Sequence, residues 1–431
     1  MRIHFIGIGG MGLSALAMYF KSLGNDVSGS DVSSGLMVKK LMDHGVNVKI
    51  GHAHVDKSID LIVKSSAVSN NDPEILQASE LGIPVIDRMT FFAKYIKPFV
   101  GITGTDGKSS TTHMTAWIAL KNRMDPILLC GAISRDLEDT NFRMGKGGIV
   151  AEVDESDPKM GRVRSEIACL TNLRYDHLER YGNDPKNQLR TIKEFLNNAH
   201  RTVVPDNFDF DASITFGKSG TLAFEKLNST FSEQVFEVKY KGEKQIVHLP
   251  VPGSHQIYNA LAAIGSGISM GISLKNCADA LSDYPGLRRR LETLYFNKNV
   301  VVIDDYAHTP DEVYAAIRAV KPYFKKVTAI FEPHRYTRFV REYKKFAISL
   351  SEVDKIFVTD IFGAFEAGNA NSNLLVEELK NLNTNAEFAK MKEIPTKLLK
   401  APKSEAYLFM GAGEITNAAH EFAEKLEELK W

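Results

Sequence analysis

Short apolar runs alternate with amphipathic stretches along the first hundred residues of the chain. Runs of about four to eight apolar residues are typical of buried strands, whereas apolar residues that recur every three or four positions indicate helices. The expected strands are residues 2–8, about 26–28, 45–52, 60–68 and 83–88. The expected helices are residues 13–23, 36–44, 73–81 and 89–96. Because strands and helices alternate, the pattern predicts an α/β fold with a parallel sheet that helices cover on both faces.

The same alternation continues beyond Pro98, which we take as the boundary between two domains because proline continues neither a helix nor a central strand. Further strands are expected at residues 148–153 and 167–173, at 299–303, and at the starts of 327–339, 355–368 and 406–415. Further helices are expected at residues 109–120 and 187–198 and within 250–271. Another helix begins at Thr309, because Pro310 and the two acidic residues that follow it suit a helix N-terminus.

Composition and charge narrow the class of protein. The chain has 431 residues, which at about 100–200 residues per domain predicts two to four domains. Lys and Arg number 53, as do Asp and Glu, so no net field favours nucleic acid or an anionic membrane. We see neither a signal peptide nor an apolar run of membrane-spanning length. We therefore expect a cytoplasmic protein that neither binds nucleic acid nor inserts into a membrane.

The most informative stretch is residues 101–112 (GITGTDGKSSTT), which joins an expected strand to an expected helix. Gly104 and Gly107 allow tight turns that a Cβ would block. A glycine-rich turn that opens a helix surrounds a phosphate with backbone N–H groups. Lys108 would then reach the β- and γ-phosphates of a nucleotide, and Ser109 would bind Mg²⁺.

This stretch departs from the general phosphate-loop pattern G-x-x-x-x-G-K-[ST], because the residue five before Gly107 is Ile102. It fits the shorter and more particular form T-G-T-x-G-K-[ST]. The alternative is a glycine-rich connection that binds nothing. The strand before the glycines and the helix after them favour a phosphate site.

A second glycine-rich loop lies near the N-terminus, in residues 7–12 (GIGGMG). Gly7, Gly9 and Gly12 fit G-x-G-x-x-G, and Asp31 follows about 20 positions later, where an acid can bind a ribose hydroxyl. By itself the motif predicts NAD, but the same geometry serves any nucleotide with a diphosphate, including a UDP-sugar. A Rossmann-like layer without a ligand is the other interpretation.

Acidic residues gather in residues 148–157 (GIVAEVDESD), where the carboxylates are Glu152, Asp154, Glu155 and Asp157. Because alternate residues of a strand share a face, the first two are expected to point the same way until the strand ends. Carboxylates near a phosphate loop indicate Mg²⁺ ligation, and a solvated charged loop is the alternative. Asp176 and His177, just after the next strand, could complete a metal or phosphate site.

Taken together, ten ordered motifs resemble those of the Mur ligases, the ATP-dependent amide-forming enzymes of cell-wall precursor synthesis. The motifs are IHFIGIGGMGLSALA, GSD, TGTDGKSSTT, AEVDESD, TN-x-x-x-DHLE, PGSHQ-x-x-NALAA, RRL, DDYAHTP, PHRYTR and GAGEI. They span essentially the whole chain. Four positions differ from the usual residues of the family, namely Asp106, Arg174, Leu291 and Glu332.

The resemblance implies three α/β domains. These are an N-terminal Rossmann-like UDP-sugar domain (residues 1–97), a central P-loop ATPase-type domain (98–292) and a C-terminal Rossmann-like domain that binds the amino acid (293–431). The implied reaction joins L-alanine to UDP-N-acetylmuramate. The carboxylate of the UDP-sugar attacks the γ-phosphate of ATP, and the amine of alanine then displaces phosphate from the acyl phosphate. The implied oligomeric state is a monomer or weak homodimer.

The resemblance also implies roles for individual residues. ATP would bind Gly104, Thr105, Gly107, Lys108, Ser109, Ser110, His255, Asn259, Arg290 and Asp305. The UDP-sugar would bind Gly9, Gly10, Met11, Gly12, Ser30, Asp31, His52, Ser66 and Arg88. Alanine would bind Tyr306, His308, Arg335 and Arg338. Ser109 and Glu152 would hold one Mg²⁺ and His177 a second, and the catalytic residues would be Lys108, His177, Arg290 and His308.

Other interpretations of the sequence stay open. Within the family, the chain could add another amino acid or a recycled peptide to UDP-N-acetylmuramate. An NAD-dependent oxidoreductase would explain the first glycine loop but neither the phosphate loop nor the acidic stretch. A nucleotide-gated binding protein without chemistry would not need Lys108, Glu152 and His177 together.

Overall fold

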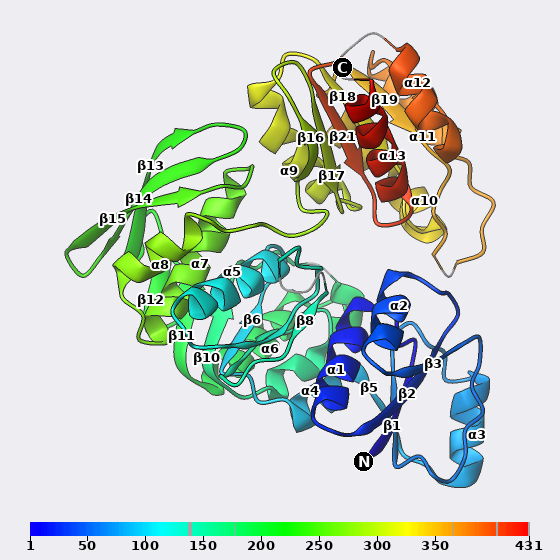
Figure 1. The fold of residues 1–431 in the computed structure, drawn as a ribbon, viewed down its shortest axis with the longest axis vertical. Coiled ribbons are helices and arrows are strands. Elements are labelled where there is room, and N and C mark those ends of the chain that lie inside the picture. Colours follow the sequence, from blue (N-terminus) through cyan, green and yellow to red (C-terminus); the bar gives the residue numbers. More distant parts are fainter. Residues whose placement is uncertain (137–139, 176, 365, 402–403, 430–431) are drawn as a thin grey trace. The chain divides into compact units, whose positions relative to one another are not determined.

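The structure is a computed structural model, and it describes residues 1–136, 140–175, 177–364, 366–401 and 404–429. Asp176 therefore lies outside the described residues. The chain divides into two compact units (Figure 1). The first unit comprises residues 1–228, 235–250 and 255–285, and the second comprises residues 229–234, 251–254 and 286–431.

The first unit contains two sheets, and the N-terminal one is a parallel sheet of five strands in the order β3-β2-β1-β4-β5. Its strands are β1 (Arg2–Ile6), β2 (Asp26–Asp31), β3 (Asn47–Ile50), β4 (Leu61–Lys64) and β5 (Val85–Asp87). Its helices are α1 (Met11–Ser22), α2 (Leu36–Asp43), α3 (Pro73–Leu81) and α4 (Arg88–Tyr95). The strand order reverses beside β1, and open α/β sheets bind ligands beyond the strand ends at such a point.

Aromatic packing fixes α4 against this sheet. Phe91 of α4 meets Phe5 of β1 edge to face with ring centroids 5.7 Å apart, and both side chains are fully buried. Asp87 caps the helix by accepting a hydrogen bond from the Thr90 N–H. The first residue of α4 is Arg88, so this packing and capping place the arginine at the edge of the sheet.

The second sheet of the first unit has ten strands in the order β15-β14-β13-β12-β11-β10-β6-β9-β7-β8. β6 (Val100–Thr103) lies between β9 (Ile149–Glu152) and β10 (Ser165–Leu170) and is parallel to both. α5 (Lys108–Lys121) follows β6 and packs against α7 (His255–Ser269). The remaining strands are β7 (Ile127–Leu129), β8 (Phe142–Arg143), β11 (Ala199–Pro205), β12 (Ile214–Gly217), β13 (Leu222–Ser229), β14 (Gln234–Tyr240) and β15 (Glu243–Leu249).

The helices of this second sheet include α6 (Pro185–Asn197) and α8 (Leu274–Leu281), with short 3₁₀ turns η1 (Pro158–Arg162) and η2 (Leu178–Tyr181). Strands β11 to β15 were not among the elements that the sequence pattern predicted. In β13, Leu222 is buried and the residues after it are half-buried or exposed without alternation, so the period-two pattern that marks a strand is weak there.

The second unit has a six-stranded sheet in the order β16-β17-β21-β18-β19-β20, in which only the β16–β17 pair is antiparallel among the described pairs. Its strands are β16 (Glu292–Phe296), β17 (Val301–Asp305), β18 (Val327–Phe331), β19 (Lys355–Val358), β20 (Ala386–Phe388) and β21 (Ala406–Met410). Its helices are α9 (Pro310–Val320), α10 (Tyr336–Leu350), α11 (Asn373–Asn381), α12 (Ile394–Lys400) and α13 (Ile415–Glu428), with short turns η3 (Lys321–Tyr323) and η4 (Met391–Glu393).

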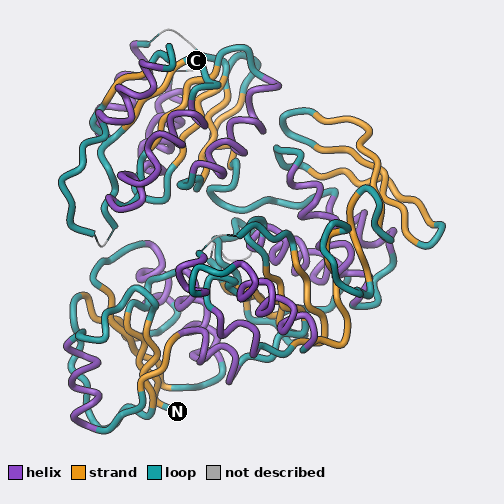
Figure 2. Tube along the Cα trace, turned by 180° about the vertical axis from the view of Figure 1, so that it is seen from behind, coloured by secondary structure: helices purple, strands orange, loops and turns teal. Residues whose placement is uncertain are grey.

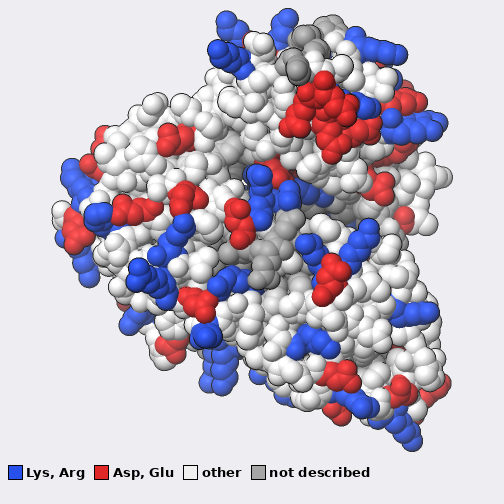
Figure 3. Space-filling view, in the orientation of Figure 1, with Lys and Arg blue, Asp and Glu red and all other residues white. Residues whose placement is uncertain are grey.

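The predicted α/β fold is confirmed, because three sheets with helices beside their strands make up the described chain (Figure 2). Residues 286–292, which we assigned to the central domain, lie in the second unit. None of the described helices is both long enough and apolar enough to cross a membrane. Acidic and basic side chains are interspersed over most of the face in view in Figure 3, in keeping with equal numbers of both.

Candidate nucleotide and substrate site

The phosphate loop occupies the turn between β6 and α5, and two glycines shape it. Gly104 and Gly107 have φ values of +135° and +75°, which side chains with a Cβ rarely adopt. A Cβ at Gly104 would lie 2.1 Å from Thr171 Oγ1, and one at Gly107 would lie 2.1 Å from Asn259 Oδ1. The loop therefore depends on glycine for both its turn and its close approach to neighbouring side chains. The N-terminus of a helix that follows such a turn can bind an anion through its backbone N–H groups.

The Lys108 side chain folds back over this loop. Its Nζ donates hydrogen bonds to the carbonyl oxygens of Gly104 (2.7 Å) and Thr105 (3.0 Å). It also lies 2.7 Å from Glu155 Oε2 in an ion pair. Burial lowers the pKa of Lys108, but the surrounding carboxylates, chiefly Glu155, outweigh burial and raise it. The ammonium is therefore charged and positioned at the loop.

Ser109 and Glu152 lie together, as the sequence predicts for a magnesium site. Ser109 Oγ donates a hydrogen bond to Glu152 Oε2 at 2.8 Å, and Gly131 N donates to the same oxygen at 2.8 Å. Glu152 is the last residue of β9, which pairs with β6, so the sheet brings the carboxylate to the phosphate loop. A hydroxyl and a carboxylate are the hard oxygen ligands that Mg²⁺ prefers, so these residues fit a magnesium ion beside a nucleotide phosphate.

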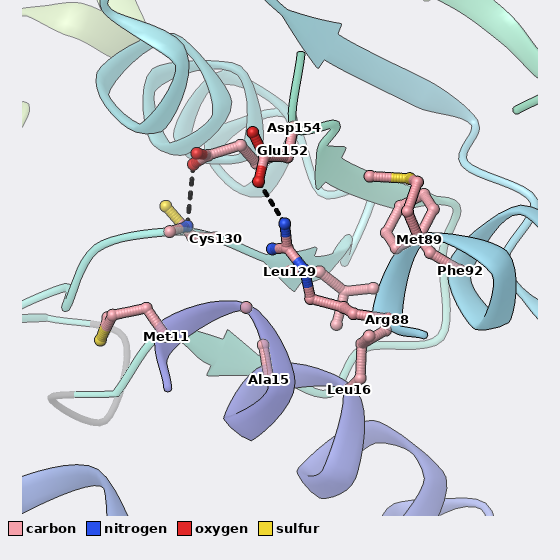
Figure 4. Close-up of a pocket in the computed structure, with 12 residues that line it drawn as sticks. Met11, Ala15, Leu16, Arg88, Met89, Phe92, Leu129, Cys130, Glu152 and Asp154 are labelled. Carbon is pink, nitrogen blue, oxygen red and sulfur yellow. Dashed lines mark hydrogen bonds and ion pairs between the residues drawn. The ribbon is translucent and has the colours of Figure 1, made fainter. Parts of the chain in front are cut away.

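A cavity of about 200 Å³ lies between α1, α4 and the ends of β7 and β9 (Figure 4). It is lined by Met11, Gly12, Ala15, Leu16, Arg88, Met89, Phe92, Leu129, Cys130, Gly131, Glu152 and Asp154. Figure 4 shows apolar side chains from α1 and α4 on one side and the two carboxylates on the other, with Arg88 reaching towards Asp154. The cavity thus extends from the first glycine loop to Glu152, the carboxylate that pairs with Ser109.

Arg88 occupies space that only a glycine leaves free. A Cβ at Gly12 would lie 2.0 Å from the Arg88 Nη1 atom. Arg88 also forms an ion pair with Asp154. Although burial acts to raise the pKa of Asp154, this guanidinium holds the pKa well below its usual range. The last glycine of the G-x-G-x-x-G motif therefore accommodates an arginine from α4 as well as the start of α1.

The first glycine loop contacts the acid predicted to bind ribose. Gly9 N donates to Asp31 Oδ2 at 2.9 Å, and a Cβ at Gly9 would lie 2.9 Å from the same oxygen. The carbonyl oxygen of Ser30 accepts hydrogen bonds from Gly7 N and Ile8 N at 2.9 and 3.0 Å. The structure therefore brings the loop after β1 and the end of β2 together, as the motif predicts.

Two other predicted UDP-sugar residues, His52 and Ser66, are exposed in loops after β3 and β4. His52 Nδ1 lies 3.6 Å from both Asp72 Oδ2 and Glu74 Oε1. Glu74 is buried and also pairs with His4 Nε2 at 2.8 Å. His52 is thus held at the sheet edge by two carboxylates at the start of α3.

The predicted second metal ligand, His177, has a left-handed backbone (φ 55°) at the start of η2. Its Nδ1 lies 3.7 Å from Glu179 Oε1. Among the described residues, His52, Asp72 and Glu74 form a group of three possible metal ligands whose ligand atoms all lie within 4.8 Å of one another. His177 and Glu152 belong to no such group of described residues. The role of His177 in a metal site stays a prediction.

Of the two predicted adenine-nucleotide residues of α7, Asn259 meets the phosphate loop, whereas His255 is exposed at the start of the helix. The helix begins at His255, as their spacing on one face requires, and Asn259 is buried. Asn259 Nδ2 donates to Gln256 Oε1 at 3.0 Å, and Asn259 Oδ1 faces Gly107. Asn259 is therefore placed beside the loop that would hold the phosphates.

In the second unit, the residues predicted to bind alanine and nucleotide gather at the end of β17. The guanidinium of Arg290 lies over the Tyr306 ring, 5.5 Å from its centroid. Asp305 accepts hydrogen bonds from Leu291 N and Ala307 N at 2.7 and 2.8 Å, and burial raises its pKa to about 6. Both oxygens of Asp305 therefore already bind the backbone of its own unit.

The tautomer of His308 follows from its hydrogen bond. Nδ1 lies 2.9 Å from the Tyr306 carbonyl oxygen, which can only accept, so Nδ1 carries the proton and Nε2 has the lone pair. Burial lowers the pKa of His308, with a neighbouring Glu312 opposing it. His308 is therefore a neutral imidazole with an acceptor nitrogen at Nε2 near pH 7.

Arg335 and Arg338 do not share a helical face. Arg335 precedes α10 with a φ of 67° and is exposed, whereas Arg338 lies in the first turn of the helix. Arg338 Nη1 donates to the His308 carbonyl oxygen at 3.3 Å. We expected the two arginines to face the same way if the turn that contains them were helical. Arg335 lies outside the helix, so this condition is not met.

Some neighbouring groups have partners that the sequence-based prediction of the site did not give. Glu155, which pairs with Lys108, was one of the four carboxylates of the acidic stretch. The guanidinium of Arg289 also lies over the Tyr306 ring, 5.1 Å from its centroid. Glu332, noted as a departure from the family pattern, accepts hydrogen bonds from three backbone N–H groups at the start of α13, those of Gly413, Glu414 and Ile415. The motif spacing contains no signal for these pairings.

Comparison with known proteins agrees with this geometry. Three family models match the chain: the Mur ligase family catalytic domain at residues 2–100, the Mur ligase middle domain at 102–267 and the Mur ligase glutamate ligase domain at 289–413. The chain therefore belongs to the Mur ligase family, and the resemblance inferred from its motifs is confirmed.

Among its relatives are proteins named UDP-N-acetylmuramate–L-alanine ligase. Those of Thermotoga maritima and Aquifex aeolicus are each 33% identical to it and align over 100% and 99% of this chain and 98% of their own length. A crystal structure of the Thermotoga maritima UDP-N-acetylmuramate–alanine ligase matches with a TM-score of 0.87 and 32% identity over 100% of both chains. A murein peptide ligase from Psychrobacter arcticus, with a TM-score of 0.71 and 21% identity over 99% of this chain and 98% of its own, shares the fold.

Proposed function

We propose that this protein joins L-alanine to UDP-N-acetylmuramate at the expense of ATP, in the synthesis of peptidoglycan precursors. The observation that carries the proposal is the position of Ser109 and Glu152. They lie between a phosphate loop with a charged Lys108 and a cavity that leads to the first glycine loop. A phosphate donor and the carboxylate that receives the phosphate need such adjoining sites.

The UDP-sugar would bind in the N-terminal part of the first unit. The backbone of Gly9, Gly10, Met11 and Gly12 faces the diphosphate, with Ser30, Asp31, His52 and Ser66 around the nucleoside. Arg88 lies at the cavity and would bind an anionic part of the sugar. A carboxylate in the cavity would then face the phosphate loop. Its attack on the γ-phosphate gives an acyl phosphate and ADP.

ATP would bind with its phosphates in the loop of Gly104, Thr105 and Gly107, against Lys108, Ser109 and Ser110. Lys108 supplies a fixed positive charge where negative charge develops on the transferring phosphoryl group. Mg²⁺ held by Ser109 and Glu152 would neutralise phosphate charge when bound. His255, Asn259, Arg290 and Asp305 are the proposed contacts of the remaining nucleotide, and His177 is the proposed ligand of a second magnesium ion.

The second unit would bind the amino acid through Tyr306, His308, Arg335 and Arg338. Alanine must lose a proton from its ammonium group before it can attack an acyl phosphate. The neutral His308 offers an unprotonated Nε2 to take that proton. An arginine would bind the carboxylate of alanine through two parallel hydrogen bonds.

We further propose the three domains at residues 1–97, 98–292 and 293–431, a cytoplasmic location and a monomeric or weakly dimeric state.

The test of the proposed ligation is phosphate release with ATP, Mg²⁺ and UDP-N-acetylmuramate. L-alanine, glycine, L-serine, other amino acids and a preformed peptide are compared in turn as acceptors. Selective turnover with L-alanine supports the proposal. Preference for a peptide would indicate a recycling ligase, and no phosphate release with any acceptor would exclude ligase activity.

A further inference from the structure

Glu155 is a buried carboxylate for which the proposed reaction has no assigned use. It follows β9 in the loop that carries Asp154, and its side chain is almost completely buried. Its backbone carbonyl oxygen accepts a hydrogen bond from the Tyr181 hydroxyl, which anchors the loop to η2. Lys108 Nζ, 2.7 Å away, is the partner of Oε2 among the described residues, and this ion pair compensates the burial of its charge.

Lys108, in turn, has no donor left for a nucleotide. An ammonium group has three N–H donors. Its Nζ lies within 3.0 Å of three oxygens, two loop carbonyls and Glu155 Oε2. To bind a phosphate, Lys108 must therefore release at least one of these partners. The carboxylate is the one partner that carries a full negative charge, so it competes with phosphate for the same interaction.

We propose that Glu155 is a positioning residue that holds Lys108 in the nucleotide-free enzyme and is replaced by the phosphates of ATP. The inference rests on the proposed function, because it needs a nucleotide in the loop. Glu155 sets how tightly nucleotide binds and how readily ADP leaves, and the charge of Lys108 stays available for phosphoryl transfer.

The exchange leaves a buried carboxylate without its cation. Arg88, a second nearby cation, is already paired with Asp154. Among the described groups, the Asp154 carboxylate and the Tyr181 hydroxyl also interact with Glu155, and neither can neutralise it. Burial already raises the pKa of Glu155 to about 7, with Lys108 opposing the rise. When the phosphates take Lys108 away from Glu155, the loss of this ion pair raises the pKa of Glu155 further. Glu155 therefore takes up one proton from solvent when nucleotide binds at pH 8.

The first experiment measures nucleotide affinity of Glu155→Gln by calorimetry with ADP and with ATP. A neutral amide can still accept a hydrogen bond from Lys108 but is a weaker competitor than a carboxylate. Since a hydrogen bond to a charged group contributes more than a neutral one, we expect binding to tighten about tenfold. The KM for ATP falls, and kcat is unchanged or falls with slower ADP release. The matched control is Glu166→Gln, an exposed glutamate of β10 paired with His200.

The second experiment needs no variant. ADP binding to the wild-type protein at pH 8 is measured in two buffers with different ionisation enthalpies, which gives the number of protons taken up. We expect an uptake of about one proton, absent in Glu155→Gln and retained in Glu166→Gln.

The possible results of these experiments bear on the role of Glu155 in different ways. Weaker nucleotide binding by Glu155→Gln, or no proton uptake by the wild-type protein, would overturn it. If Glu155→Gln does not fold, the proton count of the wild-type protein decides. If the wild-type protein binds no nucleotide at all, the proposed function itself fails. If the wild-type protein catalyses ligation but Glu155→Gln leaves nucleotide affinity unchanged, only the role of Glu155 is refuted.

Discussion

Ser109 Oγ donates a hydrogen bond to Glu152 Oε2 at 2.8 Å, although the two residues are 43 positions apart in the chain. One lies at the start of the helix after β6 and the other ends the neighbouring strand β9. The pairing places a hydroxyl and a carboxylate beside the phosphate loop, where a magnesium ion and a nucleotide would meet. Substitutions at this pair and around it should therefore separate the roles of the groups at the site.

Removal of the loop cation should abolish most of the turnover. Lys108→Ala deletes the charge that would stabilise the transferring phosphoryl group, and losing one such group typically lowers kcat by about 10²–10³-fold. The control is Lys121→Ala at the other end of α5, where the lysine is partly exposed and paired with Asp283. The kcat of both variants is measured by steady-state phosphate release. Near-normal ligation by Lys108→Ala would show that the phosphate-loop assignment is wrong.

The left-handed turn at Gly107 should tolerate no side chain. Gly107→Ala adds about 1–2 kcal/mol of backbone strain, and its Cβ also collides with Asn259. Gly271→Ala is the matched control, because Gly271 has a φ of +92° but an added Cβ would have no neighbouring atom within 4 Å. Denaturant unfolding should show a larger loss of unfolding free energy for Gly107→Ala than for Gly271→Ala. Only Gly107→Ala should also bind ATP more weakly. Equal losses with unchanged ATP affinity would contradict a tightly packed phosphate cradle.

The carboxylate at the end of β9 should control magnesium affinity. Glu152→Gln removes the charge of a proposed ligand, so we expect the Mg²⁺ concentration for half-maximal activity to rise at least about tenfold. Glu225→Gln, an exposed residue of β13, is the control. Activity is titrated with Mg²⁺ at saturating substrates, and Mg²⁺ binding is also measured directly with ADP present. An unchanged titration would place the metal elsewhere.

The contact of Arg338 with the His308 loop should matter for the amino acid alone. Lysine cannot form two parallel hydrogen bonds with a carboxylate, so Arg338→Lys should raise the KM for alanine and leave those for ATP and the UDP-sugar nearly unchanged. Arg341→Lys changes an exposed arginine on the same helix and serves as the control. Each substrate is varied in turn. A change in the KM for ATP that spares alanine would assign Arg338 to the nucleotide site.

Lys193 should be dispensable. Some Mur ligases carry a carbamylated lysine beyond their Asp-His motif, and Lys193 stands near that position, but we favour a solvated helix lysine. The Nζ of Lys193 lies 4.0 Å from Asp209 Oδ2, and the side chain is 37% exposed, which agrees with that choice. Lys193→Ala should therefore keep full activity without added acid. Inactivity that short-chain carboxylic acids partly rescue would indicate a carbamylated ligand instead.

Local features of the site were predictable from the sequence because their causes are local. Gly104 and Gly107 precede Lys108 in a turn whose backbone angles only glycine adopts easily, so the motif itself dictates the loop and the start of α5. The N-terminal strands and helices followed from apolar periodicity for the same reason. Strands β11 to β15 were not predicted: β13 has no alternating burial and carries little periodic signal, whereas β14 does alternate and its signal was missed.

The partners of the charged groups were decided only by the tertiary structure. The order of strands in the ten-stranded sheet sets β9 beside β6, and this brings Glu152 to Ser109 and Glu155 to Lys108. The packing of α4 on the first sheet directs Arg88 to Asp154. Apolar periodicity specifies which face of an element is buried but not which element lies next to it. Pairings between distant side chains therefore depend on sheet order and helix packing, which no single stretch of the chain encodes.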